Sequence, residues 1–245
     1  MEKRLQVILA EAGIASRRGS IAFIEEGRVS VDGKVVTEKG YKVDPFIHAV
    51  LVDGKPLQAP IKKKYFIFNK PKNVISTSLD THERAKITDF FKNIDGRLYS
   101  IGRLDKDTTG VIIITNDGDL THRLSHPSFE IEKEYIAKVK GNIPERNIHI
   151  LRSGIELDGK KLSRCVITKI GREKNGDIFN VKIHEGRKRQ IRRMFEEIGS
   201  DVISLERIKY AGLTSDGLKQ GEFRELTKSE EVHLKKIAGS LTGRR

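Results

Sequence analysis

An aspartate flanked by cations is the side chain of this sequence best suited to do chemistry. Asp105 lies between Arg103 and Lys106, a few residues before the apolar segment 111–115. Nearby cations favour the ionised form of a carboxylate, which can then act as a nucleophile or as a base. From these residues alone, a polar turn that leads into a strand is the competing interpretation.

Residues 187–198 are a second candidate, an amphipathic helix that is rich in cations. Ile191, Met194 and Ile198 recur at helical spacing, which predicts an apolar face. The cations crowd the N-terminal half, although that end of a helix already carries the positive pole of its dipole. Phosphate binding or a catalytic ion pair would explain this placement, whereas a solvated charged face is the alternative. The basic residues are Arg187, Lys188, Arg189, Arg192 and Arg193.

The same conflict with the helix dipole occurs near the start of the chain. Ser16 is the expected N-cap of a helix that ends at Gly27, and Arg17 and Arg18 follow it directly. Each arginine opposes the dipole by roughly 0.3–1 kcal/mol, and a bound anion would reverse that sign. We interpret the pair as a contact to RNA phosphate, with a solvated surface pair as the alternative.

Two patterns in the sequence resemble parts of metal sites. Asp105 and Asp107 match the opening of a calcium-binding loop, but the twelfth position is Asn116, where such loops carry glutamate. His122 and His126 lie four residues apart on an expected helix, yet no third zinc ligand follows at a suitable spacing. We therefore expect no metal, and we interpret the histidines as structural or as facing RNA.

The elements that must position these residues predict two domains. In the first 60 residues, two helices precede a hairpin that turns at Asp32-Gly33, and residues 57–64 resemble a linker. Beyond it, strands are expected at 65–68, 111–115, 135–139, 165–170 and 178–183, and helices at 86–92, 119–125, 144–152 and 187–198. Several neighbouring strands lack a helix between them, which predicts an α+β fold with a mixed, mainly antiparallel sheet flanked by helices.

Charge and composition narrow the choice of partner. The chain has 245 residues and a formal net charge of +13, and such an excess favours an anionic partner. The first 60 residues carry only +1 and the other 185 carry +12, so the positive field belongs to the larger domain. No apolar run is long enough to span a membrane, and we see no signal peptide. Cys165 is the only cysteine, which excludes an intrachain disulfide and favours a reducing cytoplasm.

Five segments together resemble the pseudouridine synthases that modify small- and large-subunit ribosomal RNA. Residues 102–118 resemble the family's catalytic motif, Lys133-Glu134-Tyr135 resembles its tyrosine strand, and 185–194 resembles its basic helix. Residues 69–77 resemble the strand and turn that open its catalytic domain, and 4–52 resemble an S4 RNA-binding domain. The five segments occur in the family's order and cover almost the whole chain.

The resemblance implies roles for individual residues. Asp105 matches the catalytic aspartate, Tyr135 the tyrosine that stacks on the target base, and Arg192 the arginine that pairs with the aspartate. The segment Ile208–Leu213 departs from the family's usual pattern, so the sequence does not identify which of its residues lines the pocket. The residues expected to contact RNA are Ser16, Arg17, Arg18, Lys34, Arg103, Arg187, Lys188, Arg189 and Arg193.

The implied reaction is an isomerisation, in which uracil is detached from its ribose, rotated and rejoined through carbon 5. Whether Asp105 attacks the ribose or the base stays open, and no metal, nucleotide or redox cofactor is expected. The implied domains are an S4 domain of the αL type over 1–60, a catalytic domain over 61–237 and a flexible basic tail over 238–245.

The expected partner is ribosomal RNA, and we expect a monomer that does not bind membranes. The overall pattern is closest to the branch that modifies large-subunit 23S RNA or an assembly intermediate, with small-subunit 16S RNA as the alternative. A non-catalytic, ribosome-associated S4 protein would explain the basic residues equally well. It would give no reason for Asp105, Tyr135 and the basic helix to occur together.

Overall fold

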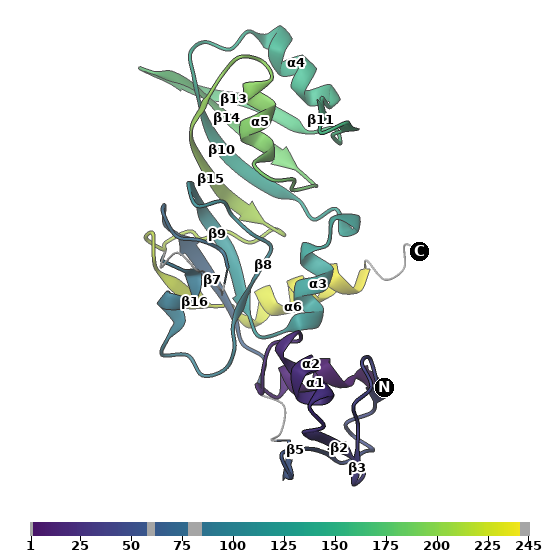
Figure 1. Cartoon of the computed structure of the whole chain (residues 1–245). Helices are drawn as coiled ribbons and strands as arrows, with labels where there is room; N and C mark the ends of the chain where they lie inside the picture. Colours follow the sequence, from purple (N-terminus) through teal and green to yellow (C-terminus); the bar gives the residue numbers. More distant parts are fainter. Residues whose placement is uncertain (1, 58–61, 78–84, 241–245) are drawn as a thin grey trace. The chain divides into compact units, whose positions relative to one another are not determined.

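The computed structural model describes residues 2–57, 62–77 and 85–240 (Figure 1). The chain divides into two compact units, one of residues 1–63 with 95–97 and the other of residues 64–94 with 98–245. Among the described residues, no helix has the length and apolar character needed to cross a lipid bilayer.

The first unit is built from two short helices and small strands around one core. Leu5, Leu9 and Ile24 are fully buried between the helices and the strands. Asp32 and Gly33 both have positive φ, 48° and 79°, as a two-residue hairpin turn requires. The expected order of helix, helix and hairpin is therefore confirmed. The elements are β1 (Lys3–Arg4), α1 (Leu5–Glu11), α2 (Gly19–Glu25), β2 (Val29–Val31), β3 (Lys34–Val35), β4 (Lys42–Val43), β5 (Val50–Val52) and β6 (Lys55–Pro56).

The second unit is organised by an eight-stranded sheet in its described part. The strand order is β13-β14-β10-β15-β9-β7-β16, and β8 also pairs with β9. Only the pair β15–β9 is parallel, so the sheet is mixed and mainly antiparallel, as the sequence predicts. The strands are β7 (Tyr65–Lys70), β8 (Tyr99–Ile101), β9 (Thr108–Thr115), β10 (Lys133–Lys140), β13 (Val166–Glu173), β14 (Gly176–Ile183), β15 (Val202–Tyr210) and β16 (Phe223–Glu225). A separate hairpin joins β11 (Glu156–Leu157) and β12 (Lys160–Lys161).

Alternate side chains of the central strands enter two separate cores, because successive residues of a strand point to opposite faces. Phe66 and Ile112 pack in the core that also holds residues of η1, α4 and α5. Ile67 and Ile113 pack in the other core, with residues of α3 and α6. Helices thus flank both faces of the sheet. They are η1 (Ile87–Phe91), α3 (Gly118–Ser125), η2 (Pro127–Phe129), α4 (Glu145–Ser153), α5 (Gln190–Glu196) and α6 (Lys228–Ser240).

The structure corrects three expectations about helices. The helix expected over 86–92 is a short 3-10 helix, η1, and the helix expected from 187 begins only at Gln190. Helix α6 runs to Ser240 and therefore includes the first residues of the expected tail. Ala238 is 4% exposed in the core, and its carbonyl accepts a hydrogen bond from Arg123 at 3.2 Å, which explains why the helix continues. Residues 241–245 of the expected tail lie outside the described residues.

Candidate active site

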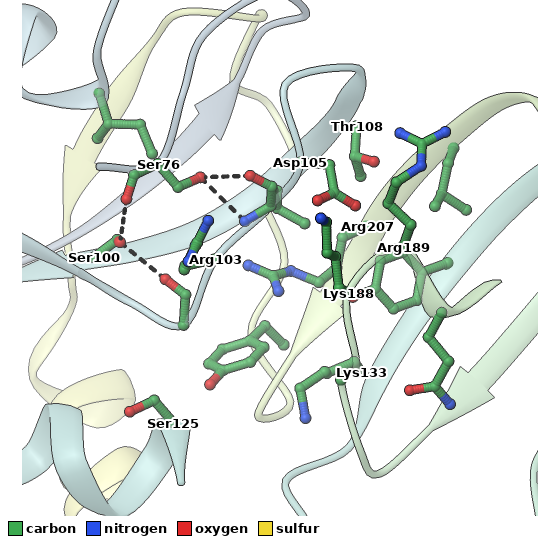
Figure 2. Close-up of a pocket in the computed structure, with 18 of the residues that line it drawn as sticks. Ser76, Ser100, Arg103, Asp105, Thr108, Ser125, Lys133, Lys188, Arg189 and Arg207 are labelled. Atoms are coloured by element: carbon green, nitrogen blue, oxygen red, sulfur yellow. Dashed lines mark hydrogen bonds between the residues drawn. The ribbon is translucent and has the colours of Figure 1, made fainter. Parts of the chain in front are cut away.

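A cavity of about 910 Å³ opens in the second unit (Figure 2). Its lining comes from the loop between β8 and β9, from β10, from the residues around the start of α5, and from β15. These segments are distant in sequence, and they meet because β15 pairs with both β10 and β9. The charged side chains of the lining are mainly cationic. They are Arg103, Lys133, Arg187, Lys188, Arg189 and Arg207, against Asp105 and Glu185.

Asp105 lies in the lining, on the loop that enters β9. Ser76 fixes this loop, because its hydroxyl accepts from the Leu104 N–H at 3.1 Å and donates to the Leu104 carbonyl at 2.8 Å. The Asp105 carboxylate has no hydrogen-bond or ion-pair partner among the described residues. A partly exposed carboxylate that is held at a cavity wall without a protein partner is available to a bound substrate.

Tyr135 also lines the cavity and is 7% exposed. It lies on β10 directly opposite Arg207 of the antiparallel strand β15, so the two side chains occupy neighbouring positions on the sheet. The Arg207 guanidinium packs over the ring of Tyr210 at 4.6 Å, and the Tyr210 hydroxyl donates to the Leu124 carbonyl at 2.6 Å. Tyr210 and Arg207 are thus fixed wall residues, and Tyr210 belongs to the segment Ile208–Leu213, whose pocket-lining residue the sequence left open.

The structure gives Arg192 a different partner from the one implied by the family resemblance. Its guanidinium forms an ion pair with Asp107 at 3.2 Å, not with Asp105, and it also donates to the Val202 carbonyl at 2.8 Å. Arg192 does not line the cavity. Burial alone would raise the pKa of Asp107, but the charges of Arg192 and Arg189 outweigh it and the pKa is lowered. Asp107 therefore fastens the loop that carries Asp105 to helix α5.

Most of the cations around α5 are already bound to protein groups, and their contacts with RNA stay a prediction. Arg187 donates to the carbonyls of Leu157, Lys160 and Lys161 at 3.0–3.1 Å. Arg193 forms a two-pronged pair with Asp158, at 2.7 and 2.8 Å, and Arg189 pairs with Asp107 at 3.3 Å. Lys188 is exposed, lines the cavity and has no partner among the described residues. Arg103 shares these three properties.

Lys133 is a cavity residue that sequence reasoning did not single out, although it stands two positions before Tyr135 on the same strand face. Its ammonium donates to the carbonyls of Ile131 and His184 at 2.7 and 3.1 Å. Burial, together with repulsion from Arg207, lowers the pKa of Lys133 to about 8. Near neutral pH this amine is a cation that can lose its proton.

The two histidines considered as a zinc pair stack against each other instead. The rings of His122 and His126 lie 5.4 Å apart, and both contact the ring of Phe129 edge-on at 6.2 and 6.0 Å. Across the described ranges, no group of three or more histidine, cysteine or acidic side chains is arranged to hold a metal ion.

Comparison with known proteins identifies the family. Residues 64–197 match the family described as RNA pseudouridylate synthase, and residues 3–46 match the S4 domain. The chain is 45% identical to a Bacillus subtilis (strain 168) protein named ribosomal large subunit pseudouridine synthase B, over 96% of this chain and 97% of that protein. The chain belongs to the RNA pseudouridylate synthase family.

The synthase also resembles other members along nearly its whole length. It is 37% identical to an uncharacterized RNA pseudouridine synthase of Aquifex aeolicus (strain VF5), over 98% of this chain and 96% of that one. A crystal structure of a pseudouridylate synthase, 28% identical, matches with a TM-score of 0.67 and covers 94% of this chain and 99% of the other. The molecule is therefore an isomerase with an S4 domain and a pseudouridine synthase domain, as the sequence predicts.

In the S4 unit, three of the four predicted contact residues lie directly before α2. The Ser16 hydroxyl accepts from the Gly19 N–H at 2.8 Å, so Ser16 shapes the turn that leads into the helix. Arg17 and Arg18 lie in that turn, before the helix begins, and both are exposed. Lys34 is exposed on β3. None of these three cations has a partner within the described part of the chain.

Proposed function

We propose that this synthase converts a uridine of large-subunit ribosomal RNA to pseudouridine. The observation that carries the proposal is the Asp105 carboxylate, which has no partner among the described residues and lies in a cationic cavity that also holds Tyr135. The name of the Bacillus subtilis relative, which matches over nearly its full length, supports the large subunit as the source of the RNA. The charge of +12 on the residues after the first 60 supports a polyanionic substrate.

The reaction needs no external reactant. The bond from ribose C1′ to uracil N1 breaks, a bond from C1′ to C5 forms, the proton leaves C5, and N1 gains a proton. Asp105 is the group proposed to react with the ribose or the base. The target base must leave the RNA helix to enter the cavity, where Tyr135 is proposed to stack on it. Arg192 is proposed to act as a positioning residue, because it binds Asp107 on the loop of Asp105.

The two units are proposed to divide the work. The exposed cations of the S4 unit, Arg17, Arg18 and Lys34, would hold RNA phosphates, with Ser16 shaping their turn. Arg103 and Lys188 would hold phosphates beside the target base. The single cysteine and a ribosomal RNA substrate support a cytoplasmic location, where we propose that the synthase acts as a monomer.

Mapping pseudouridines in ribosomal RNA from cells with and without the gene tests this proposal. We expect one or a few large-subunit positions to lose pseudouridine in the deleted strain. Restoring wild-type protein should return them, whereas Asp105→Asn should not, although we expect this variant to fold and to bind RNA normally. Loss confined to small-subunit RNA would overturn the proposed substrate. Turnover by Asp105→Asn within tenfold of wild type would overturn the role of Asp105.

A further inference from the structure

Two buried polar groups of the cavity lining lack hydrogen-bond partners within the described residues. They are Nη2 of Arg207 and Oγ1 of Thr108, on side chains that are only 1% and 2% exposed. Burying a donor or a hydroxyl without a partner is unfavourable, and most such groups in folded proteins are satisfied. Neither group is used by the mechanism proposed above, so both require an explanation.

The two residues lie on the same face of the sheet. Across the parallel pair β9–β15, Thr108 lies opposite Leu205 and Gly110 lies opposite Arg207, which places all four on neighbouring positions. Residues two apart on a strand share a face, so Thr108 and Gly110 lie on one face of β9. Arg207 lies opposite Gly110, and Tyr135 lies opposite Arg207, so Thr108, Arg207 and Tyr135 face the same side of the sheet. Figure 2 shows Thr108 and Arg207 on the same cavity wall as Asp105.

The Arg207 guanidinium is fixed in place, while its buried Nη2 has no partner among the described residues. Its Nε donates to the Val111 carbonyl at 2.8 Å, and its plane packs over Tyr210. Gly110 leaves the neighbouring position on β9 without a side chain, and a Cβ there would lie 2.2 Å from the Arg207 carbonyl oxygen. No described carboxylate forms an ion pair with this guanidinium. A fixed donor without a protein acceptor is the arrangement expected where a ligand supplies the acceptor.

We propose that Arg207 and Thr108 recognise the edge of the uracil base that carries O4, N3–H and O2. Nη2 of Arg207 donates to O4 of the arriving base, and Oγ1 of Thr108 accepts from N3–H. Along the same edge, cytosine carries an amino group at position 4 and an N3 without a proton. Its amino group is a donor that would face the donor of Arg207, so these two groups could not form a hydrogen bond. This inference rests on the proposed function only in that the cavity receives a uridine.

Depth in the cavity favours the base over a phosphate as the ligand. Arg207 and Thr108 are almost completely buried, so only the innermost part of a nucleotide can reach them. A base that stacks on Tyr135 is that part. The phosphates of the RNA remain nearer to the exposed cations Lys188 and Arg103.

The symmetry of this edge suits the isomerisation. When uracil turns by half a revolution about its N3–C6 axis, C5 takes the place of N1 and O2 changes places with O4. The order of acceptor, donor and acceptor along the edge is the same before and after the turn. Arg207 and Thr108 can therefore hold the base both as it arrives and after it has been rejoined through C5.

The first test compares Thr108→Val with Thr108→Ser. Valine matches threonine in shape but lacks the hydroxyl, whereas serine keeps it. The assay is single-turnover release of tritium from large-subunit ribosomal RNA transcripts labelled at C5 of uridine, because the C5 proton must leave. We expect Thr108→Val to lose at least about tenfold in rate and Thr108→Ser to stay within about threefold, with RNA affinity unchanged in both. Equal rates for the two variants would overturn the inference.

The second test changes the base instead of the hydroxyl. Transcripts with 4-thiouridine in place of uridine carry a weaker acceptor at position 4. We expect wild type to convert them about tenfold more slowly at saturation, and Arg207→Met to show little preference between the two transcripts. A preference as strong in Arg207→Met as in wild type would remove Arg207 from the recognition site. If Arg207→Met does not fold, the comparison of Thr108→Val with Thr108→Ser still tests the inference. If wild type releases no tritium from any transcript, the proposed function fails instead.

Discussion

Replacing Asp107 with alanine removes the carboxylate partner of a buried arginine. The Arg192 side chain is 7% exposed and that of Asp107 is 35% exposed. Breaking a fully buried pair costs about 3–5 kcal/mol, whereas an exposed pair contributes about 0–1 kcal/mol. Arg192 keeps its bonds to the Val202 and Asp107 carbonyls, which persist in the variant. We therefore expect a loss of about 2 kcal/mol in the free energy of unfolding, or about 4–8 °C in Tm for a unit of this size.

Asp158→Asn is the matched control, because Asp158 pairs with Arg193 of helix α5 and asparagine tolerates the positive φ of 56° at this position. That carboxylate is 72% exposed, so its removal should cost less than about 1 kcal/mol. Urea and thermal unfolding of both variants at pH 7 measure the difference. If Asp107→Ala destabilises the protein no more than Asp158→Asn, the loop is not fastened by this ion pair.

The pH dependence supplies a second check on the same pair. The folded-state pKa of Asp107 is lowered below its ordinary value, although burial opposes this, because Arg192 and Arg189 favour the charged form. A carboxylate whose pKa is lowered on folding stabilises the protein fully above a pH of about 4. This stabilisation is lost as the pH falls through the folded-state pKa. The difference in unfolding free energy between wild type and Asp107→Ala should therefore shrink below pH 4. A difference that stays constant down to pH 2 would contradict this account.

Three further predictions concern the cavity. Tyr135→Phe should retain more single-turnover activity than Tyr135→Ala, because stacking on a base is worth roughly 1–3 kcal/mol; equal losses would point to the hydroxyl. Lys188→Ala should reduce the slope of log binding constant against log salt concentration by about 1 without changing Tm. Arg187→Ala should instead lower Tm, because Arg187 binds three carbonyls of the 157–161 hairpin. RNA affinity should fall as pH rises through about 8, where Lys133 loses its charge, and Lys133→Arg should remove this step; affinity that is flat from pH 7 to 9 in wild type would argue against it.

Much of the fold follows from local signals that a single sequence carries. The hairpin at Asp32-Gly33 was predictable because both residues tolerate positive φ. Helix α3 begins where expected because Asp117 accepts from the Asp119 and Leu120 N–H groups, at 3.2 and 3.3 Å. Helix α6 was missed, because its stability comes from buried contacts such as those of Leu234 and Ala238 and not from a strong apolar period.

The site was predictable in its residue types and less so in its pairings. The sequence indicates that five cations around α5 conflict with the helix dipole, but their partners lie far away in the sequence. Arg192 is 85 residues from Asp107, and Arg193 is 35 residues from Asp158. A sequence shows which charges exist and not which of them meet, so arginines that hold the scaffold could not be separated from a lysine that faces the cavity. The unpartnered atoms of Arg207 and Thr108 are likewise visible only in three dimensions.

The parallel pairing of β9 with β15 has a consequence for protein synthesis. It joins residues 108–110 to residues 205–207, so one wall of the cavity is made from segments almost a hundred residues apart. A ribosome adds residues in order, at about 5–20 per second, so the S4 unit and strands β7 and β9 emerge several seconds before β15. During that interval the loop of Asp105 is present but Arg207 and Tyr210 are not. A nascent chain can thus acquire its RNA-binding module early, while modification waits for nearly complete translation.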